Sequence, residues 1–206
     1  MNLQRHITTI ALFAFFTFVS SALAQATAEV EKSESKKKTI KMVDVMLAQG
    51  KLKLKVAESW KKPDKPGSRI IEREFAIPPS KGDKAAGRLT MMRSGGSLKQ
   101  NIERWFGQFN QPDGKATKDV AKVSEKKING QEVTIVDIAG TFKESMGGGP
   151  FSPGKTVMRE DYRMLGGIVQ TKTAGQYFFK LYGPKKTIDD AEAAYVKMMD
   201  SVAPAK

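Results

Sequence analysis

The sequence contains no cysteine and one histidine among its 206 residues, and aromatic residues make up only 8% of it. Without cysteine, the chain can form no disulfide, no thiolate metal site and no thiol nucleophile. Its stability must come from packing alone, and a chain of this length can bury enough apolar surface as one domain. Acidic residues are also scarce, since 22 of them face 35 basic ones and leave a formal net charge of +13.

The first 24 residues are typical of a secretory signal peptide. Arg5 supplies the positive n-region, Ile10–Val19 the apolar core, and Ala22–Ala24 the small residues that a signal peptidase accepts. A cut after Ala26 is the other option, and it moves the mature start by about two residues. An uncleaved membrane anchor is the alternative, but the apolar core is short for a span of roughly 20 residues. We therefore expect an exported protein, periplasmic or secreted.

Cleavage would remove the only histidine, His6, together with Arg5. The mature chain would keep 34 of the 35 basic side chains against 22 acidic ones, a net charge of +12. Without histidine and cysteine, Ser-His-Asp and Cys-His nucleophilic mechanisms, the usual zinc sites and histidine-ligated haem are excluded. We expect no cofactor and no metal.

Alternation of apolar and polar residues predicts a β-rich domain over residues 39–203, after a flexible leader at residues 25–38. Asn129 and Gly130 form a strong type I′ hairpin signal. The first predicted strand has a short helix as its alternative. The expected strands are residues 42–47, 51–56, 69–77, 87–93, 119–127, 131–142, 160–171 and 177–182.

Two amphipathic helices complete the predicted fold. Ser97 and Gln100 form a capping box at the start of a helix over residues 97–109, and Thr187 is expected to cap the last helix. Trp105 lies on the apolar face of the first helix and is expected to pack in the core. The predicted class is α+β: an antiparallel sheet of about 6–8 strands with two helices packed on it. The apolar faces comprise Leu98, Ile102, Trp105, Phe106 and Phe109 in one helix, and Ile188, Ala191, Tyr195, Met198, Met199 and Val202 in the other.

From residue 50 to residue 203, this order of elements resembles the PsbP-like fold, a sandwich of sheet and helices. The segments Gly87–Met91, Asn101–Trp105 and Asp161–Leu165 also resemble uncharacterised exported bacterial proteins. The fold family includes an extrinsic photosystem subunit, a nuclear-import factor and bacterial envelope proteins of the DcrB and LpqN type. The resemblance implies a non-enzymatic envelope or accessory role, and it supplies no functional residues.

The segment Gly149–Thr156 matches the P-loop pattern GxxxxGK[ST]. A P-loop aims consecutive backbone N–H groups at phosphates and opens a helix. Pro150 and Pro153 each lack such a group, and residues 162–170 favour a strand. We therefore expect no nucleotide binding and interpret this region as a loop that contacts a partner, with the candidate residues Gly147, Gly148, Gly149 and Phe151.

Carboxylates offer the remaining route to catalysis, because two of them across a cleft can hydrolyse sugars. Glu72 and Glu74 are expected on one face of a strand. Asp137 alternates onto the same face as Val133 and Ile135, where burial would suit an acid catalyst. Pairing of Asp137 with a lysine, or a place at the sheet edge, is the alternative. The second candidate function is therefore a small histidine-free hydrolase that uses carboxylates.

The first candidate function is an exported, non-enzymatic binding or accessory protein of the cell envelope. Its basic surface would attract an envelope protein, an anionic lipid or an acidic polysaccharide. Solvated faces and protection of sheet edges are the alternative explanation of the charge. Nucleic acid is an unlikely partner because no recognition motif is present. The candidate contact residues are Lys51, Lys53, Lys55, Lys61, Lys62, Lys65 and Arg69.

Overall fold

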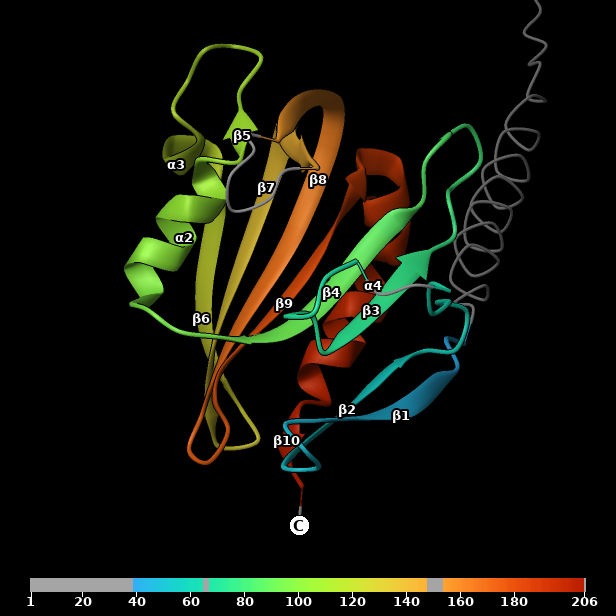
Figure 1. The fold of residues 1–206 in the computed structure, drawn as a ribbon, viewed down its shortest axis with the longest axis vertical. Helices are drawn as coiled ribbons and strands as arrows, with labels where there is room; N and C mark the ends of the chain where they lie inside the picture. Colours follow the sequence, from blue (N-terminus) through green and yellow to red (C-terminus); the bar gives the residue numbers. More distant parts are fainter. Residues whose placement is uncertain (1–38, 65–66, 148–153, 206) are drawn as a thin grey trace, which may run out of the picture. The chain divides into compact units, whose positions relative to one another are not determined.

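A computed structural model describes residues 39–64, 67–147 and 154–205 of the chain (Figure 1). The predicted signal peptide and leader lie outside these residues, so both stay predictions. Within the described part, no helix is long and apolar enough to cross a membrane.

The described residues form two antiparallel sheets. The smaller sheet has the order β1-β2-β10, and the larger has the order β3-β4-β9-β8-β7-β5, with β6 also paired to β7. The strands of the smaller sheet are β1 (Met42–Leu47), β2 (Leu52–Ala57) and β10 (Ala203–Pro204). Those of the larger sheet are β3 (Arg73–Ile77), β4 (Gly87–Ser94), β5 (Phe109–Asn110), β6 (Lys122–Ile128), β7 (Gln131–Met146), β8 (Lys155–Thr171) and β9 (Gly175–Pro184).

Three helices accompany the sheets in this part of the chain: α2 (Leu98–Phe106), the single turn α3 (Thr117–Val120) and α4 (Lys185–Asp200). Helices α2 and α4 cover opposite faces of the larger sheet (Figure 1). Two separate hydrophobic clusters result, one under each helix. Because both faces are covered, residues 164–169 of β8 are all buried.

Two adjacent glycines in the middle of β8 allow both helices to approach the sheet closely. A Cβ atom on Gly166 would lie 2.4 Å from the ring of Trp105 in α2, and one on Gly167 would lie 2.6 Å from the side chain of Met199 in α4. Neighbouring residues of a strand point to opposite faces, so each glycine makes room for one helix. Trp105 also meets Phe178 edge-on at 5.4 Å between ring centroids, which confirms its predicted place in the core.

The predicted α+β class is confirmed, with an antiparallel sheet and an amphipathic helix on each face. The first two predicted strands do pair, and Asn129 and Gly130 both have positive φ, as a type I′ turn requires. The N-terminal hairpin, however, forms its own sheet with β10. Strand β3 begins only at Arg73, and α2 ends at Phe106, so that Phe109 belongs to β5.

The predicted cap of the last helix is wrong. Helix α4 begins at Lys185, before Thr187, and Pro184 at its N-cap forms no side-chain cap. Instead, Oδ2 of Asp83 accepts hydrogen bonds from the backbone N–H and the hydroxyl of Thr187, at 2.9 and 2.5 Å. A residue distant in the sequence thus satisfies the first turn of the helix, which local sequence cannot reveal.

Candidate functional site

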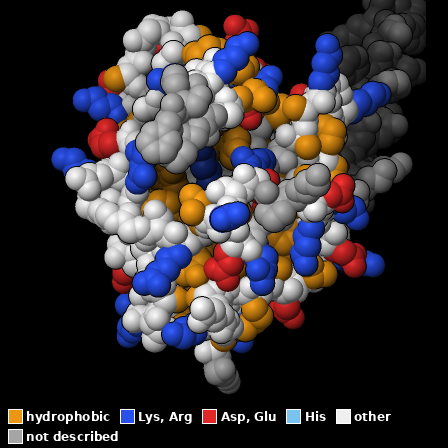
Figure 2. Space-filling view, viewed as in Figure 1, with side chains coloured by type: hydrophobic (Ala, Val, Ile, Leu, Met, Phe, Trp, Pro, Cys, Tyr) orange, Lys and Arg blue, Asp and Glu red, His pale blue; other side chains and the backbone are white. Residues whose placement is uncertain are grey.

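A lysine lies among aromatic rings on the α2 face of the larger sheet. Lys180 of β9 is partly buried, and its Nζ atom lies 4.8 Å from the ring centroid of Tyr182 and 5.0 Å from that of Phe142. Figure 2 views this face, on which basic and hydrophobic side chains lie side by side. We call Lys180, Arg88, Tyr182, Phe142 and Gln108 the Lys180 site.

Among the described residues, the amine of Lys180 has only a neutral hydrogen-bond partner. It donates a 2.5 Å hydrogen bond to Oε1 of Gln108, and no carboxylate of the described residues forms an ion pair with it. A partly buried cation without an opposite charge is costly, because the surrounding rings replace water poorly. The site therefore has one positive charge for which the described residues offer no counter-ion.

A second cation contacts the same tyrosine. Arg88 of β4 donates a 2.8 Å hydrogen bond from Nη1 to the hydroxyl of Tyr182 and pairs through Nε with Oε1 of Glu74 at 2.7 Å. These two bonds use two of the five guanidinium N–H groups. Arg88 also holds the pKa of Glu74 below its usual range, chiefly through the hydrogen bond between the two side chains. Glu74 is thus an ion-paired carboxylate.

Strand pairing brings the remaining residues of the site together. The segment after α2 pairs with β7 through β5, and the backbone carbonyl of Gln108 accepts a 2.8 Å hydrogen bond from the N–H of Lys143. The β7–β8 register shifts between Gly140 and Phe142, where Asp161 on β8 has a positive φ of 51°. This bulge places Arg159 directly opposite Phe142.

Beyond the bulge, a further pair of charges borders the site. Arg159 donates a 2.7 Å hydrogen bond to Oε2 of Glu144, so these two charges cancel. The ring of Tyr162 stacks parallel to that of Phe142, with an interplanar angle of 4° and centroids 6.1 Å apart. The border of the site is therefore an aromatic wall with a neutralised ion pair, and the uncompensated charge stays at Lys180.

Burial shifts the titration of this site. The pKa of Lys180 falls to about 7 from its ordinary value of 10.5, first because its amine is removed from water and second because of the charge of Arg88. Burial also raises the pKa of Tyr182. A lysine with so low a pKa, placed between aromatic rings and near a second cation, is typical of functional sites.

The carboxylates proposed for catalysis do not form a free pair. Glu72 accepts hydrogen bonds from the backbone N–H of Ala48 and from the hydroxyl of Tyr177, a residue of the core under α4, whereas Glu74 pairs with Arg88 on the α2 face. The expectation that both acids share one face is therefore wrong. Residue 72 precedes β3, so strand alternation does not extend to it.

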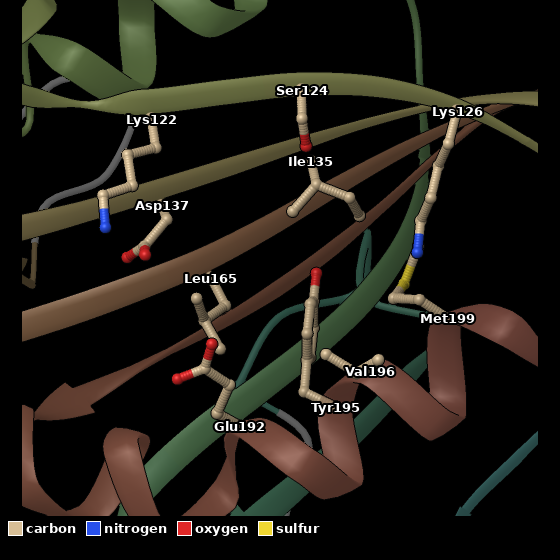
Figure 3. Close-up of a pocket in the computed structure, with 10 residues that line it drawn as sticks. All are labelled: Lys122, Ser124, Lys126, Ile135, Asp137, Leu165, Glu192, Tyr195, Val196 and Met199. Atoms are coloured by element: carbon tan, nitrogen blue, oxygen red, sulfur yellow. The ribbon is translucent and has the colours of Figure 1, made fainter.

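Asp137 lies on the face of the larger sheet that α4 covers, in a groove of about 260 Å³ between β6 and α4 (Figure 3). It receives two hydrogen bonds from Arg163, of 2.9 and 2.8 Å, and the same guanidinium also binds Asp189 and Glu192. The predicted partner of Asp137 was a lysine, and the partner in the structure is this arginine. The carboxylates of Asp137 and Glu192 line the groove, and both form ion pairs with Arg163. The described residues therefore offer no pair of free acids there.

A serine and two lysines line the same groove. Ser124 lies on β6 between Lys122 and Lys126, and all three point toward the groove in Figure 3. The amine of Lys126 is bound to Oδ1 of Asp200 at 2.9 Å. Within the described residues, the amine of Lys126 is thus engaged by a carboxylate rather than by Ser124.

The sequence-predicted lysines occupy exposed positions elsewhere. Lys53 and Lys55 of β2 and Lys51 just before it are exposed, while Leu52 and Leu54 between them are buried. The strand register places the acidic Asp44 opposite Lys55. Lys61, Lys62 and Arg69 are also exposed, whereas Lys65 lies outside the described residues. Their role in binding stays a prediction.

The predicted partner loop is described only at its ends. Gly147 is the last described residue before this loop and has a positive φ of 66°. Gly148, Gly149 and Phe151 lie outside the described residues. Lys155 and Thr156 belong to strand β8 rather than to a helix. The helix N-terminus that a P-loop uses is thus replaced by a strand at this position.

Sequence reasoning missed Lys180, although one signal was present. In β9 the residues Phe178, Lys180 and Tyr182 fall on one face of the strand, and the two aromatic rings are buried. A lysine in the middle of a strand that is apolar on both faces breaks the pattern. Such a break marks a candidate site, but only the fold shows that Arg88 and Gln108 meet it.

No family model matches this chain, and no curated protein matches it. Among solved structures, it is similar to the cyanobacterial PsbP protein CyanoP from Synechocystis sp. PCC 6803, with 11% identity and a TM-score of 0.46 over 82% of this chain and 95% of the other. It is also similar to the Ran-binding protein Mog1p of Saccharomyces cerevisiae, with 8% identity and a TM-score of 0.45 over 80% and 95% of the two chains.

Proposed function

We propose that this chain is an exported, non-enzymatic binding protein of the cell envelope that holds an anionic ligand at the Lys180 site. The observation that carries the proposal is the charge of Lys180, whose neighbours in the described part of the chain are aromatic rings and a neutral amide, without a paired carboxylate. An anion beside Lys180 would supply the missing opposite charge.

The surroundings of the amine favour a particular kind of anion. Phe142, Tyr162 and Tyr182 provide apolar and aromatic surface, and Arg88 has N–H groups that can donate to a second oxygen of the ligand. A binding site that is mostly apolar with a few converging polar groups fits a small organic molecule. The ligand class is therefore a small organic anion, such as a carboxylate, sulfonate or phosphate ester.

The net charge of the mature chain supports the same function at longer range. An excess of basic side chains raises the local concentration of anions around the protein and speeds their encounter with it. In this account, exposed lysines such as Lys53 attract an anionic partner without selecting it. The Lys180 site provides the selection.

The hydrolase is the weaker candidate function. It requires an acid and a base that are free to exchange protons with a substrate. In the described residues, Glu74, Asp137 and Glu192 each bind an arginine. These ion pairs support a structural role for the carboxylates.

Binding of the aromatic anion 8-anilinonaphthalene-1-sulfonate tests the proposal. Its fluorescence should rise in a saturable titration with the folded protein, and Lys180→Met should weaken binding at least about tenfold, the effect of losing one charge-assisted contact. Lys53→Met removes one charge from an exposed position and should leave the affinity within about twofold. Equal affinity of the wild type and Lys180→Met would contradict the proposal.

A further inference from the structure

The amine of Lys180 has the surroundings of a nucleophile as well as those of an anion ligand. Lysine amines become reactive toward carbonyl groups when they are removed from water or placed beside another cation. Both conditions hold here, since Nζ lies within 5.0 Å of two aromatic ring centroids and Arg88 binds the hydroxyl of one of these rings. Most other lysines of the described chain are exposed, as Lys53 is.

We infer that Lys180 captures small keto acids as an imine, with the carboxylate of the keto acid held by the N–H groups of Arg88. The inference rests on the proposed function, because it assigns the ligand of the same site. A keto acid combines the anion that the site lacks with a carbonyl carbon that a lysine amine can attack. Tyr182 connects the two protein groups, as its ring faces Lys180 and its hydroxyl binds Arg88.

The reaction needs no oxidant, reductant or cofactor. The neutral amine attacks the carbonyl carbon, a carbon–nitrogen bond forms, and the carbonyl oxygen leaves as water with the two hydrogens of the amine. The product is a carbon–nitrogen double bond between Lys180 and the ligand, and hydrolysis reverses the step. The fall of the pKa of Lys180 to about 7 supplies neutral amine near neutral pH, where an ordinary lysine is almost fully protonated.

Reductive trapping tests the inference. The folded protein is incubated at pH 7 with pyruvate and sodium cyanoborohydride, which reduces an imine to a stable secondary amine, and the modified lysines are identified by peptide mass spectrometry. Lys180 should be modified at least about tenfold faster than the exposed Lys53, because its lowered pKa supplies neutral amine and Arg88 can hold the carboxylate of pyruvate beside it. Modification of Lys180 no faster than that of Lys53 would overturn the inference.

Methyl pyruvate tests the role assigned to the carboxylate. The ester keeps the ketone and lacks the negative charge, so the ratio of Lys180 to Lys53 modification should fall at least about fivefold when it replaces pyruvate. An unchanged ratio would show that the site does not recognise the carboxylate, and it would overturn the assignment of a keto acid as the ligand. Lys53 serves as the internal reference for the different reactivity of the two ketones.

Two variants separate this inference from the proposed function. Lys180→Arg keeps the charge and cannot form the imine, and Lys180→Met lacks both. Thermal unfolding of each variant shows whether it is folded. If Lys180→Arg binds 8-anilinonaphthalene-1-sulfonate as the wild type does while Lys180 of the wild type resists trapping, the imine fails and the anion site stands. If Lys180 is trapped selectively but the wild type does not bind the dye, the imine stands and the broader anion site fails.

Discussion

At the scale of the residue, Lys180 is a group that costs the fold stability. Its amine loses water and, among the described residues, gains Gln108 and two aromatic rings; this burial, with the charge of Arg88, lowers its pKa to about 7. Below this pKa the folded protein must carry a charge in poor surroundings, whereas the unfolded chain keeps the same charge in water. A residue that destabilises the fold in this way is expected to serve a function.

This cost predicts how the stability of Lys180→Met depends on pH. Between about pH 7 and pH 10.5 the unfolded chain binds more protons at this residue than the folded protein does. The wild type therefore gains stability relative to the variant as the pH rises, by up to about 1.4 kcal/mol per pH unit. The variant should be the more stable protein below pH 7, and its advantage should shrink by pH 9.

Urea unfolding of both proteins at pH 6, 7.5 and 9 measures this difference. Because each pair is compared at one pH, the titration of the other lysines cancels. A difference in unfolding free energy that is the same at all three pH values would show that Lys180 titrates as an ordinary lysine.

At the scale of the element, the order of the longer strands and of helices α2 and α4 could be predicted from the sequence, whereas β5, β10, the helical turn α3 at the start of the strand expected from residue 119, and the contacts of the site could not. Alternation revealed β2 and β4, and the turn at Asn129 and Gly130 fixed the β6–β7 register, because these signals depend on near neighbours in the chain. The cap from Asp83 to Thr187 joins residues 104 positions apart. No local pattern reports such a pairing.

The site follows the same division. Its strand β9 and helix α2 could be placed from the sequence, and the lysine within β9 is visible there. The alignment of Phe142 with β8 depends on the bulge near Asp161. The approach of Lys180 on β9 to Arg88 on β4 depends on the strand order β4-β9-β8. Both arise from long-range strand pairing, which a single sequence does not encode in any short segment.

The glycine pair in β8 predicts where the elements pack most tightly. A Cβ atom at Gly166 would collide with Trp105, and one at Gly167 with Met199 and Tyr195. Alanine at either position should lower the free energy of unfolding by about 1–3 kcal/mol, the usual cost of overpacking a core. Gly95→Ala is the matched control, because no atom lies within 4 Å of its added Cβ.

Chemical denaturation of the three alanine variants measures this cost. Gly166→Ala and Gly167→Ala should shift the midpoint downward without changing the slope, whereas Gly95→Ala should leave it unchanged within about 0.5 kcal/mol. Wild-type stability of the two β8 variants would show that α2 and α4 do not approach the sheet as closely as described.

At the scale of the whole molecule, the basic excess predicts weak, salt-sensitive attraction to anionic surfaces. Salt screens exposed charges over about 8 Å at physiological ionic strength, so a contact made by exposed lysines weakens as salt is added. Changing Lys51, Lys53 and Lys55 to glutamate should therefore lower the salt concentration that elutes the protein from heparin resin. The matched control changes the exposed Lys84, Lys99 and Lys172, and it alters the net charge equally. If both triple variants elute together, net charge alone explains retention and the β2 lysines form no special contact.

Export is the second prediction at this scale. Arg5, the apolar core and Ala22–Ala24 predict cleavage, so N-terminal sequencing of the protein from its producing cell should begin at Gln25 or within about two residues of it. Mature protein that retains Met1 would contradict the predicted cleavage.

The position of a bound anion tests the central claim most directly. In a crystal structure of the folded protein with 8-anilinonaphthalene-1-sulfonate, the account predicts the sulfonate within hydrogen-bond distance of Nζ of Lys180 or the guanidinium of Arg88, at about 2.7–3.2 Å. The aromatic rings of the dye should pack against Phe142, Tyr162 or Tyr182. A dye bound only in the groove between β6 and α4, or only against the lysines of β2, would contradict the claim that the Lys180 site selects the ligand.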